Sequence, residues 1–473
     1  MNKKNQALQV ILAFLFSALL TSSAFAVDSL HSYLLKAQNN DPDYLGARAS
    51  YEAEFENRAL GRAGLFPTIS YSVGTTRVVQ SRRDLGVTAT RDFLYDTRSN
   101  TLSFRQPLFD VERWASYKEG DARAEHAEIA FADAHQNLIL RVAQAYFDYL
   151  LADHTVDLAK AQSATLAAQR TQAENLYKSG VATVTDVAET QARQSIAKAQ
   201  EFSAASALDL RRRELGKLIG EMPRAPMSAI PSVGAGDTPL PAAFNVPPPS
   251  IAIARPVITP ELIPPQPNTL EPWMEQAKAA NLRVLALRLL VTISGYQLDR
   301  ATASDYPTVS LVASRQQSKE PSYFGASEDT SQIGVQLQMN LFSGGSASAQ
   351  KRQAESQREK VRQDLESAIR DAEIKTSQAF LEIVNGIATI RALEQAVKSA
   401  ALAVEGNQAG QRAGLKTNSD VLNSQQQWFS VRRDLQRERF SYLVNRLKLQ
   451  AMVGNVSEAD VIALDRLANA TSP

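Results

Sequence analysis

Apolar and polar side chains alternate along several short stretches of this chain. The clearest stretch spans nine residues, in which glycine, glutamine and asparagine separate the apolar positions Ile333, Val335, Leu337, Met339 and Leu341. This period of two predicts a β-strand with one apolar and one polar face. A membrane-barrel strand needs this alternation, because one of its faces contacts lipid and the other contacts a water-filled lumen. A half-buried strand in the sheet of a soluble protein shows the same alternation. Alternation alone therefore leaves both interpretations open.

The first half of the chain shows the same kind of segment twice. Ile69, Tyr71 and Val73 alternate with small polar residues, and a second strand is expected around Leu102 to Leu108. We expect a polar loop from Thr75 to Arg98 between these strands. A helix from Leu30 to Ala63, ended by a glycine and a proline, is expected before them.

A seven-residue repeat dominates the rest of each half. Residues 111–178 and 346–412 contain no proline and few glycines, so each predicts one helix of about 100 Å. The apolar positions of the first helix recur every seven residues, which predicts coiled-coil packing. These positions are Leu138, Ala145, Ala152, Ala159, Leu166 and Ala173, with Val142, Tyr149 and Val156 beside them, and Ala379, Gly386, Leu393 and Ala400 in the second helix.

Each long helix stops at a glycine, Gly180 in the first and Gly414 in the second. Glycine at a helix C-terminus accommodates the left-handed backbone that closes the last turn. A returning helix starts at once, with Thr185 or Ser419 available as its N-cap. Each half is therefore expected to contain a helical hairpin about 100 Å long with a tight turn at its end.

The second half of the chain repeats the first. Gly180, Thr183, Asp186 and Val187 recur 234 positions later as Gly414, Thr417, Asp420 and Val421. Upstream, the segment Phe66-Pro67-Thr68-Ile69-Ser70 recurs as Tyr306-Pro307-Thr308-Val309-Ser310. A repeat with a long, fixed period indicates two copies of one structural unit. We place the first repeat at 27–221 and the second at 273–457, with a C-terminal tail at 458–473.

Between the repeats, residues 222–272 hold 14 of the 20 prolines. This composition is typical of an extended, semi-rigid connector. It fits a plain linker, and it also fits a strap packed around the middle of the molecule.

The N-terminus predicts a secretory signal over residues 1–26. Two lysines precede an apolar run of about 11 residues and an Ala-x-Ala cleavage site. The run is shorter than the ~20 residues of a membrane-spanning helix. The chain has no cysteine and a net charge of +1, so thiol chemistry is excluded and no basic surface for nucleic acid is expected.

The number of strands in each chain limits how the chain can assemble in a membrane. Each chain offers four strand candidates, whereas a sheet in lipid must close on itself and closed membrane barrels need at least eight strands. Two copies would give a narrow barrel filled by side chains, and three would give twelve strands and room for a channel. The sequence therefore predicts an oligomer.

Several motifs together resemble the TolC-type outer-membrane channels. They are the two helix–(F/Y)PT(I/V)S–strand units, the strand exit Leu341-Phe342-Ser343-Gly344-Gly345 and the two G-x-x-T-x-x-D-V hairpin tips. The resemblance covers nearly the whole mature chain, and the length of the Pro-rich connector departs from it. It implies a mainly α-helical homotrimer whose three chains share one 12-stranded β-barrel, four strands from each, continuous with a long coiled-coil α-barrel.

The same resemblance implies function and partners. The family provides the exit duct of tripartite efflux pumps and type I secretion systems, located in the outer membrane with a periplasmic extension. It implies a passive channel that contacts outer-membrane lipid, a periplasmic adaptor and an inner-membrane transporter of the ABC or RND type. The sequence does not indicate which cargo is exported.

The resemblance also implies a gate at the hairpin tips. The acid that lines the gate falls on Asp420, once in each of three chains. The cation that holds the gate shut falls on Lys416, and its carboxylate partner falls on Asp186, beside Thr185. The alternative is that both aspartates have a structural role only and stabilise helix N-termini.

Two gate positions depart from the family pattern. Asn423 replaces a second ring acid, and Gln411 replaces a tyrosine that helps to close the gate. Lysine also offers a flexible point charge where arginine would clasp a carboxylate with two hydrogen bonds. A weaker and less cation-selective gate is therefore expected.

No enzyme motif is present in the sequence. The four histidines, His31, His126, His135 and His154, lack metal-binding spacing, and we expect no cofactor and no catalysis. The alternative to a channel is a periplasmic coiled-coil adaptor without a pore. The repeated pair of lipid-compatible strands favours the channel, because an adaptor does not need them.

Overall fold

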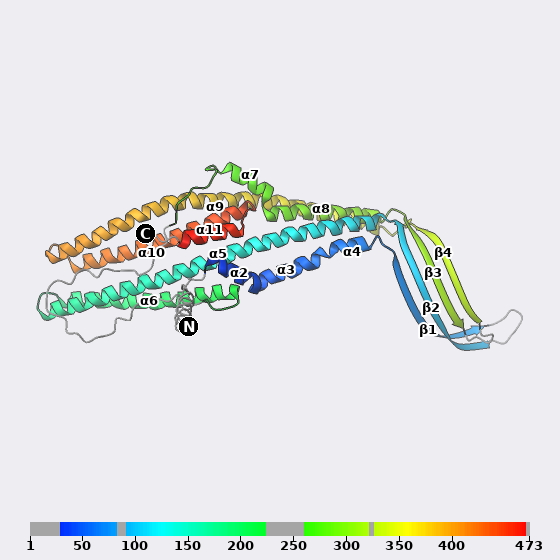
Figure 1. Ribbon diagram of the computed structural model, residues 1–473, viewed down its shortest axis with the longest axis horizontal. Helices are drawn as coiled ribbons and strands as arrows, with labels where there is room; N and C mark the ends of the chain where they lie inside the picture. The colour runs from blue at the N-terminus through cyan, green and yellow to red at the C-terminus, as the bar shows by residue number, and fades with distance from the viewer. Residues whose placement is uncertain (1–28, 83–90, 224–259, 321–325, 470–473) are drawn as a thin grey trace, which may run out of the picture. The chain divides into compact units, whose positions relative to one another are not determined.

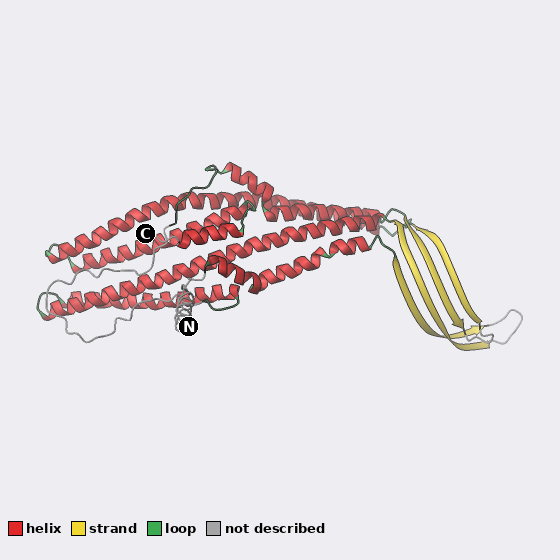
Figure 2. Cartoon of the chain, in the orientation of Figure 1, coloured by secondary structure: helices red, strands yellow, loops and turns green. Residues whose placement is uncertain are grey.

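The computed structural model describes residues 29–82, 91–223, 260–320 and 326–469 (Figures 1 and 2). The expected signal segment 1–26 and most of the Pro-rich connector lie outside these residues. The chain divides into two compact units, each built from separate stretches of sequence. The first comprises Met1–Leu45, His135–Met274 and Lys375–Pro473, and the second comprises Gly46–Ala134 and Glu275–Ile374.

A four-stranded antiparallel sheet belongs to the second unit. Its strands, in spatial and chain order, are β1 (Thr68–Arg82), β2 (Arg91–Phe109), β3 (Thr308–Glu320) and β4 (Ala326–Gln338). The expected polar loop from Thr75 to Arg98 was wrong, because β1 and β2 continue through most of it. Arg77 lies opposite Asp96 and forms an ion pair with it at 2.8 Å. Backbone ladder hydrogen bonds hold such polar strands together without an apolar pattern.

The two faces of the sheet differ in polarity, as the alternation predicts. The register aligns the apolar row Ile69, Phe104, Ala313 and Ile333 across all four strands. The adjacent row, on the opposite face, is Ser70, Ser103, Ser314 and Gln332. Ile69 and Ile333 are 70% and 77% exposed in the single chain. One face of the sheet thus presents uncovered apolar side chains and the other presents polar ones.

The segment expected as one helix from Leu30 to Ala63 forms three helices instead. These are α2 (Leu30–Asn40), α3 (Pro42–Phe55) and α4 (Asn57–Ala63). Asp41 ends the first helix with an extended backbone, ψ 117°. The residue before a proline avoids the helical region because the proline ring collides with it. Pro42 therefore accounts for the first break.

The two long helices confirm the sequence prediction at both ends. They are α5 (Val111–Lys178, 68 residues) and α9 (Ser346–Arg412, 67 residues). The returning helices α6 (Val184–Ile219) and α10 (Asn418–Met452) have only 36 and 35 residues. The hairpins are therefore about 54 Å long rather than 100 Å. Gly220 ends α6 with a left-handed φ of 76°, which the sequence analysis missed.

The predicted coiled-coil seam lies in the core of the first unit. Leu138, Val142, Tyr149 and Val156 are all at most 5% exposed, and Leu166 and Ala173 are also buried. Alanine at several seam positions lets neighbouring helices approach closely. The largest buried side chains of this unit include Tyr442 and Phe147, which come from α10 and α5.

The described end of the connector packs against α10. Pro260 and Pro265 are buried. The Tyr442 hydroxyl accepts a hydrogen bond from Ile263 N and donates one to Ile263 O, both at 2.9 Å. Residues 260–270 therefore form a packed strap, one of the two alternatives that the sequence left open.

Three more elements complete the described chain: α7 (Glu271–Ala280), α8 (Leu282–Ala303) and α11 (Glu458–Asn469). Helix α11 occupies most of the segment expected as a C-terminal tail. Over the ranges that the structure describes, no single helix is long and apolar enough to cross a membrane, and only the bent pair α7–α8 meets that test jointly.

Candidate functional site at the hairpin tips

The two hairpin tips have the same turn. After α5, Gly180 takes a left-handed φ of 78°, and after α9, Gly414 takes 72°. In the first turn Val181 N donates to Leu176 O at 2.9 Å, and in the second Leu415 N donates to Gly410 O at 2.8 Å. These bonds satisfy carbonyl groups that the helix end would leave open. Both glycines thus act as the helix stops that the sequence predicts.

The helices that leave the turns are capped by Thr183 and Thr417, so the expected caps Thr185 and Ser419 were wrong. Thr183 is N-cap and Asp186 is the third helical residue, which gives a reciprocal capping box. The Thr-x-x-Asp spacing of the repeated motif carries this signal. Thr185 is the second residue of the helix and is exposed.

Both capping aspartates are held in the ionised form. The Thr183 hydroxyl and then its backbone N–H lower the pKa of Asp186 below its usual value. The Thr417 backbone N–H and then its hydroxyl lower the pKa of Asp420 in the same way. A carboxylate that accepts hydrogen bonds resists protonation. The tips therefore carry two fixed negative charges per chain at neutral pH.

The remaining expected gate residues lie on the second hairpin. Lys416 is exposed, and its stem covers Gly410 so closely that a Cβ at 410 would lie 2.8 Å from Lys416 Cγ. Gln411 Nε2 donates to Asn418 Oδ1 at 3.3 Å. Within the part of the chain that the structure describes, no ion pair joins Lys416 to Asp186. The structure thus places them on separate hairpins without bringing them together.

Other residues join the two hairpins, and the sequence analysis missed them. Ser419 Oγ donates to Glu189 Oε1 at 3.0 Å. Arg193 Nη2 donates to Asn423 Oδ1 at 2.9 Å, and its Nη1 donates to Gln426 Oε1 at 3.3 Å. Glu189 and Arg193 are themselves paired at 2.9 Å along α6. In the sequence, only the i, i+4 spacing of these two charged residues could be seen. The same spacing is common on the solvent-exposed faces of helices.

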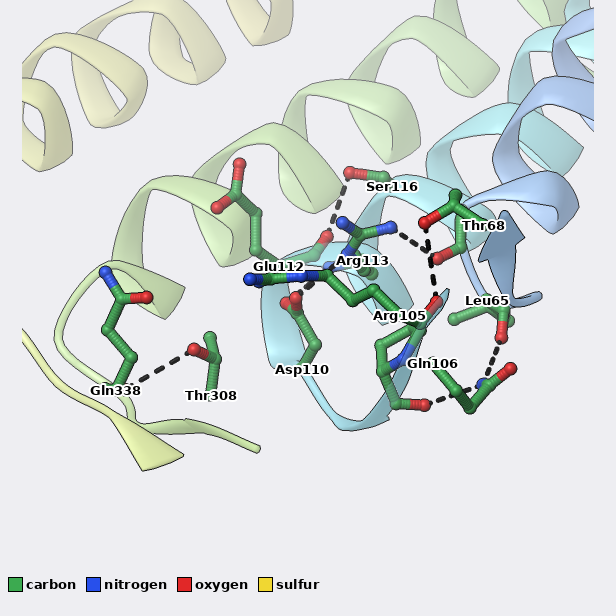
Figure 3. Close-up of polar contacts among 12 residues, drawn as sticks. Leu65, Thr68, Arg105, Gln106, Asp110, Glu112, Arg113, Ser116, Thr308 and Gln338 are labelled. Atoms are coloured by element: carbon green, nitrogen blue, oxygen red, sulfur yellow. Dashed lines mark hydrogen bonds and ion pairs between the residues drawn. The ribbon is translucent and has the colours of Figure 1, made fainter. Parts of the chain in front are cut away.

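A second polar cluster fixes the sheet to α5 (Figure 3). Asp110 accepts hydrogen bonds from the backbone nitrogen of Arg113 at 3.0 Å and from its Nε at 3.1 Å. The same guanidinium donates through Nη1 to Gly64 O at 2.7 Å. Gln106 Nε2 donates to Leu65 O at 2.9 Å. The strand therefore passes into the helix through a junction held by side chains from both.

The junction also preserves the internal repeat. Thr68 Oγ1 donates to Arg105 O, and Thr308 Oγ1 donates to Gln338 O, both at 3.4 Å (Figure 3). The two threonines are equivalent positions of the (F/Y)PT(I/V)S motif. Each ties the first residue of one strand to the neighbouring strand.

Comparison with known proteins gives the same family throughout. The family model described as outer membrane efflux protein matches residues 34–221 and 273–455. The alkaline protease secretion protein AprF of Pseudomonas aeruginosa is 34% identical over 461 residues, which cover 95% of this chain and 90% of that protein. The proteases secretion protein PrtF of Dickeya chrysanthemi is 30% identical, with 98% and 95% covered. The outer membrane protein TolC of Escherichia coli is 24% identical, with 94% and 86% covered.

Solved structures share the fold at lower identity. The outer membrane protein VceC of Vibrio cholerae superposes with a TM-score of 0.72 at 18% identity, covering 90% of this chain and 96% of that one. The CmeC outer membrane channel of Campylobacter jejuni gives 0.74 at 12% identity, with 93% and 90% covered. The expected TolC-like fold is confirmed. By family model, by sequence and by fold, this chain belongs to the outer membrane efflux protein family and is an outer-membrane channel of Gram-negative bacteria for efflux or type I secretion.

Proposed function

We propose that three copies of the chain build one transport duct. Each copy contributes its four strands to a closed 12-stranded barrel in the outer membrane and its hairpins to an α-helical barrel in the periplasm. The observation that carries this proposal is the sheet, which has one exposed apolar face and one polar face. Such a sheet suits lipid on one side and a watery lumen on the other. The signal segment 1–26, the two repeats (27–221 and 273–457) and the connector 222–272 form the proposed organisation.

We propose further that the hairpin tips are the gate of this duct. Asp420 from three chains forms an acidic ring, and aspartate is ionised at neutral pH. Facing carboxylates in a narrow aperture bind polyvalent cations and repel one another. Lys416 is proposed to pair with the carboxylate of Asp186, beside Thr185, between hairpins elsewhere in the assembly. Asn423 leaves this gate with fewer charges than a second ring of acids would give, and Gln411 stands where the family pattern has a tyrosine that helps to close the gate.

The exported cargo is proposed to be a protein. Two relatives, at 34% and 30% identity, are named for the secretion of proteases. This chain matches both over nearly their whole length. We therefore propose a type I secretion system, with an ABC-type transporter and a periplasmic adaptor as partners. A role with an RND-type pump for small molecules is the competing assignment.

Single-channel conductance of the purified mature protein in a planar bilayer tests the duct and the ring together. Discrete conductance steps, blocked by polyvalent cations from one side only, are expected. The Asp420→Ala variant should lose most of this block, and unchanged block would remove Asp420 from the ring. A folded trimer that never conducts, even as Lys416→Ser, would favour the adaptor alternative.

The cargo assignment has its own test. Cells that lack their outer-membrane channel for a secreted protease should export the protease again when this chain is supplied with a matched transporter and adaptor. Rescue of drug efflux without rescue of protease export would overturn the type I assignment.

A further inference from the structure

Polar side chains join the two hairpins of one chain near their tips. Arg193 on α6 reaches across to Asn423 and Gln426 on α10. Glu189, one turn earlier on α6, accepts from Ser419 at 3.0 Å. The Arg193 side chain is 25% exposed and that of Glu189 is 33% exposed, so both are partly shielded from water. We call these five residues the cross-hairpin network.

The aspartates that the family resemblance assigns to closure are engaged elsewhere. In the described chain, the side chains of Asp186 and Asp420 each bond to the threonine that caps their own helix. These bonds stay within one hairpin. A guanidinium, by contrast, carries five donors in a fixed fork and can hold several acceptors at once. Arg193 uses this fork to hold Glu189 on its own helix and two amides on the other hairpin.

An apolar contact lies next to the network. Leu166, Ala197 and Leu422 form a buried cluster in which each is at most 7% exposed. Ala197 follows Arg193 by one helical turn. Because this cluster also joins the two hairpins, we expect them to stay paired when the polar network alone is broken.

We propose that Arg193 ties the two hairpins of each chain together and sets how readily the gate opens. Glu189 is a positioning residue for its guanidinium and itself binds Ser419, and Asn423 and Gln426 are the groups that Arg193 binds on the other hairpin. This inference rests on the proposed gate. It assigns the closing contact to Arg193, in place of a pair between Lys416 and Asp186 within the chain. Asn423 then has a defined role as an acceptor for Arg193.

The decisive measurement compares the open-to-closed ratio of single channels in Arg193→Gln and the parent protein. A rise of roughly tenfold is expected, because the variant loses charged hydrogen bonds across the hairpins. Arg170→Gln is the matched control. Arg170 lies near the same tip but bonds to Glu174 and Gln194 within its own hairpin. An Arg193→Gln channel that gates like the parent, or a similar rise in Arg170→Gln, would overturn the proposal.

Variants at Asn423 test the same contact from the other side. Asn423→Asp places a carboxylate opposite the guanidinium and should lower the open fraction several-fold, while Asn423→Ala should raise it. In a double variant with Arg193→Gln, the change Asn423→Ala should add nothing further, because the contact is already lost. Additive effects would show that the two residues act separately. Asn423→Asp preserves side-chain size, so it keeps the test valid if Arg193→Gln folds poorly.

The outcomes separate this inference from the proposed function. If the parent conducts but Arg193→Gln does not alter gating, the cross-hairpin network fails and the channel stands. If parent, Arg193→Gln and Lys416→Ser are all folded trimers and all silent, both proposals fail.

Discussion

Thr417 donates two hydrogen bonds to one carboxylate oxygen of Asp420, from its backbone nitrogen at 3.0 Å and from its hydroxyl at 2.8 Å. Asp420 N returns a bond to Thr417 Oγ1 at 3.2 Å. Thr183 and Asp186 form the same ring in the first repeat, 234 positions earlier. The aspartates at the tips thus stabilise helix N-termini, which does not conflict with a role in ion binding.

The capping boxes predict how the tips respond to pH. Because the folded pKa of Asp186 and Asp420 lies below the usual value of 3.8, their stabilisation is complete above that pH and is lost as pH falls through the lowered pKa. Hydrogen-exchange protection factors of peptides around residues 183 and 417 should therefore be constant from pH 7 to 5 and fall below pH 3.8. In Thr417→Ala the fall at the second tip should begin at higher pH. Equal behaviour of both tips in that variant would contradict the assignment.

Glycine substitutions near the second tip should act in opposite directions. Gly414→Ala puts a side chain on a backbone with φ 72°, and it should destabilise the hairpin by about 1 kcal/mol. Gly406→Ala is the control, because no atom lies within 4 Å of an added Cβ in helix α9. It should stabilise the hairpin by about 0.5–1 kcal/mol through helix propensity. Thermal denaturation that ranks the two variants in the reverse order would refute the turn geometry.

The junction between sheet and helix should depend on Arg113. Arg113→Gln removes the donors to Asp110 and to Gly64 O and should cost about 1–3 kcal/mol of unfolding free energy. Arg48→Gln breaks only an exposed ion pair with Glu52 and should change stability by about 0.5 kcal/mol or less. Protease resistance of the two folded variants gives the comparison. Similar resistance would mean that the junction is held mainly by the backbone ladder.

His154 should remain neutral at physiological pH. Burial, and then the nearby charge of Arg432, lower its pKa below the usual 6.5. Because the neutral form is favoured in the folded chain, the associated stability is complete above pH 6.5 and is lost as pH falls through the lowered pKa. Arg432→Gln should raise the pKa of His154, though burial keeps it below 6.5. Histidine ring signals followed by NMR during a pH titration would show the shift, and an unchanged midpoint would exclude Arg432 as a cause.

Sequence patterns predicted the helices better than the strands. The ends of α5 and α9 followed from proline-free stretches and from the glycines that stop them. The outer parts of β1 and β2 were missed because their apolar residues are consecutive, as in Val78-Val79 and Phe93-Leu94-Tyr95, so no period of two marks them. Pro42 was visible, but the glycine and proline after Ala63 were interpreted as the end of one helix, and the break at Pro42 was missed.

The contacts at the tips were only partly predictable. The Thr-x-x-Asp spacing encodes each capping box within one turn of chain, and a closer look at that spacing identifies Thr183 and Thr417 as caps. The bonds of Arg193 to Asn423 and Gln426 join residues about 230 positions apart. No local pattern reports such a pairing, because it depends on how α6 and α10 pack.

In the described chain, β1 and β4 each have a neighbouring strand on one side only. While the chain is alone, their unpaired backbone groups are unfavourable in hydrocarbon and the apolar face between them is unfavourable in water. If three copies complete the barrel as proposed, a single newly exported chain needs its sheet edges and apolar face shielded until it meets the other copies. Biogenesis is then expected to be cooperative, with orphan chains degraded rather than inserted, and the number of ducts per cell should depend steeply on the rate of synthesis.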